Sequence, residues 1–109
     1  PAGEDAGEPH LDLALFEAAV TGYAASAGDL VTPPEAELLV TGLLVICTEL
    51  ACRFAADALN ESYFGWNPQR FRTRGEHNLH RARIQLALAR DVLQKRSQAE
   101  QIVAGAFPP

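Results

Sequence analysis

The sequence predicts an all-α fold, and three observations support this. Nearly half of the 109 residues, 48%, are apolar, and Ala and Leu, which favour helices, dominate. Apolar residues recur at helical spacing in three separate stretches. Capping residues mark the starts of those stretches. We therefore expect three main helices, at about residues 12–27, 33–59 and 78–96, in one domain.

The first helix is expected to begin after Asp12 and to end at Gly28. The segment PAGEDAGEP that precedes it is small, acidic and aperiodic, so residues 1–10 are expected to be a linker and residues 11–109 the helical domain. Between Leu11 and Tyr23 the apolar residues recur at helical spacing. Asp12 suits the N-cap and Gly28 the end of the helix.

The second helix has the clearest start. Thr32 suits the N-cap, Pro33 the first helical position, and Glu35 completes a capping box. Gly42 is the sole helix-breaking residue between this start and Leu59. Because this helix is apolar on nearly every side, we expect other elements to surround it, and two further helices could cover only part of it.

A long loop rich in aromatic residues and arginine is expected at residues 60–76, before the third helix. Asn78 is the expected N-cap of that helix, and residues after 97 are expected to be a short apolar tail with at most one more turn. A loop of this length is unusual in a compact domain, which favours a role in function or docking.

The net charge of −5 divides unevenly along the chain. Residues 1–62 hold eleven Asp and Glu against Arg53 alone (1 − 11 = −10), and residues 63–109 hold eight Lys and Arg against three acids (8 − 3 = +5). This asymmetry predicts either an anionic partner for the second half or attraction between the halves.

The two cysteines and the apolar runs bear on the compartment. Cys47 and Cys52 lie five residues apart in one predicted helix, so they face different directions and are expected to stay reduced, as in a cytoplasmic protein. Thr41, Thr48 and Glu49 interrupt the longest apolar run, so no membrane span is expected.

Several patterns suggest chemistry that the surrounding residues do not support. His10-Leu11-Asp12 has the beginning of a kinase catalytic loop, but the metal-binding Asn is replaced by Glu17, so Asp12 is expected to cap a helix. His77 and His80 have metal-ligand spacing without a third or fourth ligand, and no metal is expected.

The arginines around Phe71 could contact nucleic acid. Because the chain is acidic and carries no nucleic-acid-binding signature, we expect no nucleic-acid partner and interpret these arginines as a solvated or internally paired cluster.

Glu49, Arg53 and Asp57 follow each other at helical spacing on the apolar helix. Charges in such a helix are costly unless paired, so one interpretation is that the three pair with one another. The other is that they face a cavity where Arg53 binds a polar substrate. The residues show no phosphate-binding glycine loop and no Ser/His/Asp set, so no catalytic residue is expected in this chain.

Three blocks together resemble a known family: LDLALFEAAVTGY, ELLVTGLLVICTELACRFAADAL, and YF followed by GEHNLHRARIQLAL. Their order is similar to the C-terminal end of the aminoglycoside-phosphotransferase-like small-molecule kinases, in the branch of the N-acetylhexosamine and other sugar 1-kinases. The resemblance spans about residues 2–96. It implies the helical C-terminal part of a protein-kinase-like fold, whose nucleotide lobe, catalytic loop and metal-binding Asp precede this region.

The resemblance also implies site residues, cofactors and partners. The family's substrate-facing Arg and Tyr match Arg53 and Tyr63, although Ala58 stands where the family has Tyr and the loop between Tyr63 and His77 is longer. The parent enzyme would use ATP and Mg²⁺ to phosphorylate a hydroxyl of a sugar or similar metabolite, and this chain alone would be inactive. Its partners would be the rest of the kinase and the substrate. The alternative is a free-standing helical module that docks through its apolar middle helix.

Overall fold

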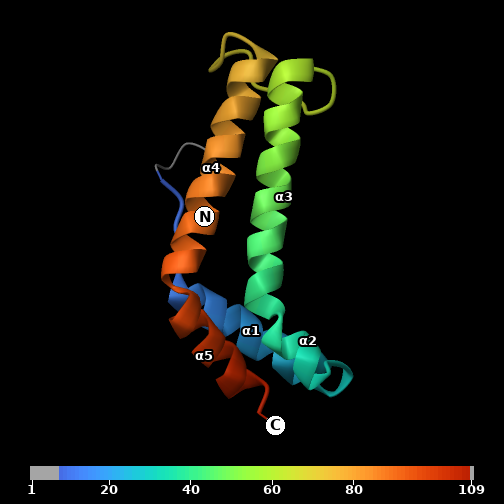
Figure 1. The fold of residues 1–109 in the computed structure, drawn as a ribbon, viewed down its shortest axis with the longest axis vertical. Coiled ribbons are helices and arrows are strands. Elements are labelled where there is room, and N and C mark those ends of the chain that lie inside the picture. The colour runs from blue at the N-terminus through green and yellow to red at the C-terminus, as the bar shows by residue number, and fades with distance from the viewer. Residues whose placement is uncertain (1–7, 109) are drawn as a thin grey trace.

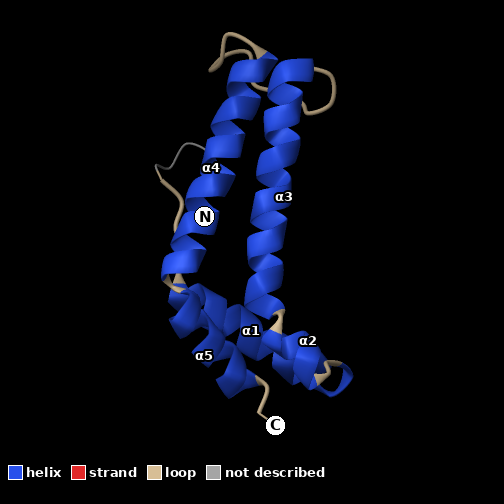
Figure 2. Cartoon of the chain, in the orientation of Figure 1, coloured by secondary structure: helices blue, strands red, loops and turns tan. Residues whose placement is uncertain are grey.

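The computed structural model describes residues 8–108, and these form helices without any strand (Figures 1 and 2). The helices, in chain order, are α1 (Leu13–Ala27), the 3₁₀ turn η1 (Gly28–Leu30), α2 (Pro33–Glu37), α3 (Leu39–Asn60), α4 (Arg74–Gln94) and α5 (Arg96–Ala106). The all-α prediction is confirmed, but five α-helices replace the expected three.

The helices divide into a long hairpin and a smaller base. The antiparallel helices α3 and α4 form the hairpin, and α1, α2 and α5 gather at its lower end (Figure 1). The molecule measures 51 × 24 × 23 Å and its radius of gyration is 16.3 Å. A compact domain of this length would have a radius of gyration of about 13 Å, so the fold is elongated.

The expected single helix at 33–59 is wrong, because the chain bends at Leu38. The Thr32 capping box is present, with the Glu35 N–H donating to Thr32 Oγ1 over 3.4 Å and the Thr32 N–H to Glu35 Oε1 over 2.8 Å. Leu38 then leaves the helical region, with φ −95° and ψ 1°, and separates α2 from α3. The bend buries Ala36 in the base.

The third predicted helix is wrong at both ends. It starts at Arg74, and after a bend at Lys95, with φ −101° and ψ 10°, the chain continues as α5. The segment expected to be a tail is therefore an 11-residue helix. Ala99 and Val103 recur four residues apart and are buried, which is the signal of an amphipathic helix.

The hydrophobic core lies in the base. It joins one buried residue of α1, one of α2, the first turn of α3, the end of α4 and α5: Val20, Ala36, Val40, Val92, Ala99 and Val103. The two bends make this possible, because they let α5 pack against both α1 and α2. The far end of the hairpin lies beyond this core.

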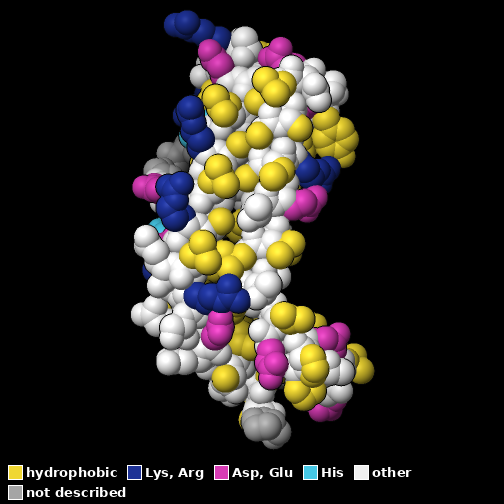
Figure 3. Space-filling model, in the orientation of Figure 1, with side chains coloured by type: hydrophobic (Ala, Val, Ile, Leu, Met, Phe, Trp, Pro, Cys, Tyr) yellow, Lys and Arg dark blue, Asp and Glu magenta, His cyan; other side chains and the backbone are white. Residues whose placement is uncertain are grey.

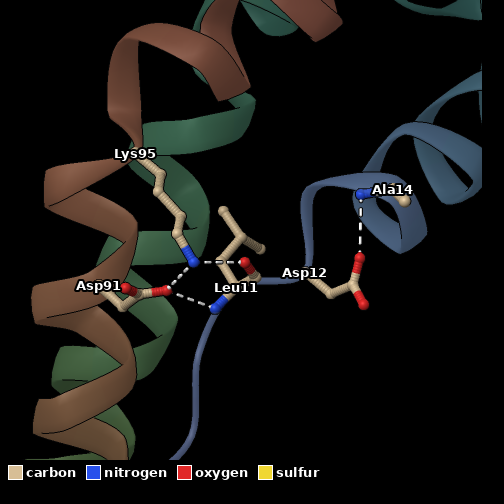
Figure 4. A network of polar contacts seen from close by, with 5 residues as sticks. All are labelled: Leu11, Asp12, Ala14, Asp91 and Lys95. Atoms are coloured by element: carbon tan, nitrogen blue, oxygen red, sulfur yellow. Dashed lines mark hydrogen bonds and ion pairs between the residues drawn. The ribbon is translucent and has the colours of Figure 1, made fainter.

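Hydrogen bonds from Asp91 and Lys95 fix the start of α1 to the bend between α4 and α5 (Figure 4). Asp91 Oδ2 accepts from the Leu11 N–H over 2.6 Å and from Lys95 Nζ over 2.7 Å, and Lys95 Nζ also donates to the Leu11 carbonyl over 2.8 Å. Asp12 caps α1 as predicted, accepting from the N–H groups of Ala14 and Leu15. Both backbone groups of Leu11 are thus held at the α4–α5 bend.

Helix α3 is less covered than its composition suggests. Only 17% of its most apolar stretch is buried, and Val45, Ile46 and Leu59 are exposed. By length and composition alone α3 could cross a membrane, which differs from the expectation that Thr41, Thr48 and Glu49 interrupt it too often. Its apolar surface contacts α4 on one side and is otherwise largely open.

Candidate functional site

The candidate site lies at the tip of the hairpin, where residues 61–73 connect α3 to α4. Glu61 ends α3 in the left-handed conformation, with φ 49° and ψ 45°, and its N–H donates to the Asp57 carbonyl over 2.8 Å. The Glu61 carboxylate accepts from the Gly75 N–H over 2.7 Å, and Arg74 Nη1 donates to the Glu61 carbonyl over 2.8 Å. These contacts close the neck of the loop.

Asp57 organises the first part of the loop. Its carboxylate accepts from the backbone N–H groups of Ser62, Tyr63 and Phe64 over 2.8, 3.0 and 2.9 Å. It also accepts from Asn78 Nδ2 over 2.8 Å. Asp57 is only 4% exposed, so these four donors replace water around its charge.

The pKa of Asp57 follows from this environment. Burial raises it, but the backbone hydrogen bonds from Ser62, Phe64 and Tyr63 and the side-chain bond from Asn78 outweigh burial and hold the pKa below its ordinary value. Asp57 is therefore ionised at neutral pH. The expected pairing of Asp57 with Arg53 is replaced by this network.

Asn78 lies inside α4 and does not cap it, so the predicted cap is wrong. The N-cap is Thr73, whose hydroxyl accepts from the Glu76 N–H over 3.0 Å. The side chain of Asn78 is fully buried, donates to Asp57 and accepts from Arg81 Nη1 over 3.1 Å. Asn78 thus ties the two helices together at the tip.

The second part of the loop rests on His77 and Arg81. His77 Nδ1 accepts from the Asn67 N–H over 3.0 Å, and the Phe71 ring stacks on the imidazole with centroids 4.2 Å apart. Arg81 Nη1 donates to the Gly65 carbonyl. His77 and Arg81 therefore hold the second part of the loop against α4.

Gly75 is required where α4 approaches α3. A Cβ at this position would lie 2.6 Å from the Ala58 carbonyl oxygen, a distance that real Cβ contacts do not reach. Only glycine lets the start of α4 approach the end of α3 this closely.

The structure brings together both residues predicted to bind substrate. The guanidinium carbon of Arg53 lies 5.7 Å from the ring centroid of Tyr63 and 5.6 Å from that of Phe64. Arg53 also forms an ion pair with Glu49 over 3.8 Å. Tyr63 is 72% exposed and the Arg53 side chain 47%, so both groups are open to solvent.

This arrangement presents an aromatic face beside a charged hydrogen-bond donor. The guanidinium offers planar N–H donors that suit hydroxyl, carbonyl or carboxylate oxygens, and the Tyr63 ring offers an apolar face. The Asp57 hydrogen bonds fix the backbone of Tyr63 and Phe64, so the aromatic side of the site has a defined position. Within residues 8–108, no three His, Cys, Asp or Glu side chains are grouped so that they could hold a metal ion.

A separate cleft of 830 Å³ lies at the base, between η1, α2 and the end of α5. It contains none of the predicted site residues. Its walls are mostly apolar, with the carboxylates of Asp29, Glu37 and Glu100 among its lining groups.

Sequence reasoning missed the roles of Asp57 and Asn78. The available signal was an Asp one turn before the end of an apolar helix, where a buried carboxylate requires several donors. Comparison with known proteins adds no assignment, since neither a family model nor a solved structure was found to match the chain.

Proposed function

We propose that the chain is the C-terminal helical portion of an ATP- and Mg²⁺-dependent phosphotransferase that acts on a hydroxyl of a sugar or another small polar metabolite. The observation that carries the proposal is the pairing of Arg53 with Tyr63 at the hairpin tip. The two residues were assigned to the substrate from separate sequence blocks, ten positions apart, and they form one solvent-facing surface.

In this proposal Arg53 donates hydrogen bonds to substrate hydroxyl or carbonyl oxygens and Tyr63 forms a wall of the site. The chain supplies neither nucleotide contacts nor a catalytic base, so chemistry belongs to the remainder of the enzyme. ATP and Mg²⁺ would bind there, where they provide and activate the transferred phosphoryl group. The uncovered apolar surface of α3 supports a packing role against that remainder.

The test measures γ-phosphate transfer from ATP to a panel of sugars by the polypeptide encoded by the complete reading frame containing these residues. Tyr63→Ala and Arg53→Lys are expected to raise the KM for the acceptor at least tenfold with a smaller change in kcat, because both residues bind substrate rather than react. Tyr23→Ala, at the chain's other tyrosine, is the matched control and leaves the KM unchanged. Unaltered KM in both site variants would reject the assignment of the site.

A second function is favoured by the exposed surface of α3: a free-standing helical module that docks on a partner. In that case the reading frame would contain no H-x-D-x-x-x-x-N catalytic loop, and no ATP would be consumed.

A further inference from the structure

Two rows of exposed apolar side chains run along the α3–α4 hairpin, and the strip between these rows is called the groove below. On α4, Leu79, Leu86 and Leu93 repeat every seven residues and are exposed. Leu79 and Leu93 directly follow the buried residues Asn78 and Val92, so this row lies beside the surface of α4 that contacts α3. On α3, Val45, Cys52 and Leu59 repeat at the same interval and are likewise exposed. Both rows are rotated in the same sense from the residues at the α3–α4 contact, and in antiparallel neighbours this rotation places them on the same face of the hairpin.

Small residues form the floor of this groove. Thr48 and Ala55 lie between the Val45 row and the α3 residues that contact α4, and at the end next to the base Thr41 Oγ1 accepts from Arg96 Nη2 over 2.6 Å. The Thr48 hydroxyl donates to the Leu44 carbonyl of its own helix over 2.8 Å, so its hydrogen atom is already engaged. Apolar walls on both sides of a shallow floor fit a third helix, and the seven-residue repeat is the spacing at which helices interlock.

Basic side chains line the α4 border of the groove. Arg83 and Arg90, also seven residues apart, are exposed on the outer side of the leucine row, and Lys and Arg side chains border the apolar column on the α4 side (Figure 3). Among residues 8–108 neither arginine has an ion-pair partner, whereas Arg53, Lys95 and Arg96 each pair with an acid four residues away.

We infer that this groove binds an amphipathic helix with apolar residues at heptad spacing and acidic residues on the flank next to α4. The helix belongs to the part of the enzyme that precedes this chain, and in that respect the inference rests on the proposed function. The leucine row spans about 21 Å, which corresponds to about four helical turns of the occupant.

A second copy of the chain fits the groove less well. With α4 packed antiparallel on α4, a two-fold axis would place the arginines of one copy beside those of the other, and like charges would repel. A helix with an acidic flank satisfies both the apolar rows and the two arginines.

Cys52 provides the readout, because it lies in the groove and is exposed, whereas Cys47 is buried. The 109-residue chain is treated with a maleimide in the presence of a designed three-heptad peptide, with leucines on one face and glutamates on its flanks, or of the same peptide with lysines replacing the glutamates. Mass spectrometry gives the modification rate of each cysteine. We expect the glutamate peptide to slow Cys52 modification at least tenfold more than the lysine peptide, and less so at high salt.

The double variant Arg83→Glu/Arg90→Glu is expected to reverse the peptide preference, and its circular dichroism spectrum reports whether the helices remain folded. Leu86→Glu, at an exposed position, is expected to abolish protection by either peptide. Equal protection by both peptides, no protection by either, or protection that grows with chain concentration alone would overturn the inference.

In the full-length polypeptide Cys52 is expected to be protected without any added peptide. Cys52 modification as fast as in the 109-residue chain would overturn the assignment of the helix to the same polypeptide. Selective peptide binding in a polypeptide that lacks phosphotransferase activity would leave the groove assigned and reject only the proposed function.

Discussion

Replacing Asn78 with Ala tests whether polar contacts, rather than an apolar core, hold the hairpin tip. Asn78 is fully buried and makes one hydrogen bond to the Asp57 carboxylate and one from the Arg81 guanidinium. A hydrogen bond to a charged partner contributes about 1.5–3 kcal/mol. Because Asp57 keeps its three backbone donors, the two losses are not fully additive, and we expect the unfolding free energy of the Asn78 variant to fall by about 3 kcal/mol.

This loss is a large fraction of the stability of a small domain, about 5–15 kcal/mol. Urea unfolding followed by circular dichroism is expected to show a midpoint lower by about 1–2 M. Fluorescence of Trp66, the only tryptophan, reports the loop directly and is expected to show the same lowered midpoint as the helical signal. Gln98→Ala, at an exposed position of α5, is the matched control. A midpoint for the Asn78 variant equal to that of the control would refute the reasoning.

Three further results follow from the structure. Asp57 and Asp91 have pKa values below the ordinary value of about 3.9. Each therefore contributes stability that is complete above that pH and is lost as the pH falls through the folded-state pKa. Acid unfolding followed by circular dichroism should begin below about pH 4, and a transition near pH 6 would contradict this. Gly75→Ala should destabilise the chain by about 1–3 kcal/mol through the clash with Ala58, whereas Gly105→Ala, with open space around it, should stabilise α5 by about 0.5–1 kcal/mol. Equal changes in melting temperature for the two variants would reject the close approach of α4 to α3. Thr32→Ala should lower the unfolding free energy measured in urea by about 1 kcal/mol, because it removes the α2 cap. Thr21→Ala, at an exposed position of α1, should leave it unchanged.

Local patterns predicted the parts of the fold that depend on neighbouring residues. The all-α class, the caps at Asp12 and Thr32 and the end of α1 at Gly28 all follow from short-range chemistry. The bends at Leu38 and Lys95 did not follow, because neither residue is a helix breaker. They arise where α2 and α5 turn to bury Ala36, Ala99 and Val103 in a common core.

The two residues predicted for the candidate site lie together in the structure, but the contacts that build the surrounding loop were not predictable. Arg53 and Tyr63 came from a family resemblance, and their proximity is a property of the folded loop. One of the two interpretations of the sequence pairs the Asp57 carboxylate with Arg53 on its own helix, because i, i+4 spacing makes that pairing available. In the structure the Asp57 carboxylate instead accepts a hydrogen bond from Asn78, which lies 21 positions away in the sequence. Spacing along the sequence does not predict such a contact.

The most direct test of the central claim is phosphoryl transfer by the polypeptide encoded by the complete reading frame around these residues. Incubated with Mg²⁺ and ATP labelled at the γ-phosphate, it is expected to transfer the label to a sugar hydroxyl, and Arg53→Lys is expected to raise the KM for that sugar. A reading frame without an H-x-D-x-x-x-x-N loop ahead of Pro1, or a polypeptide that transfers no label to any acceptor, would contradict the account.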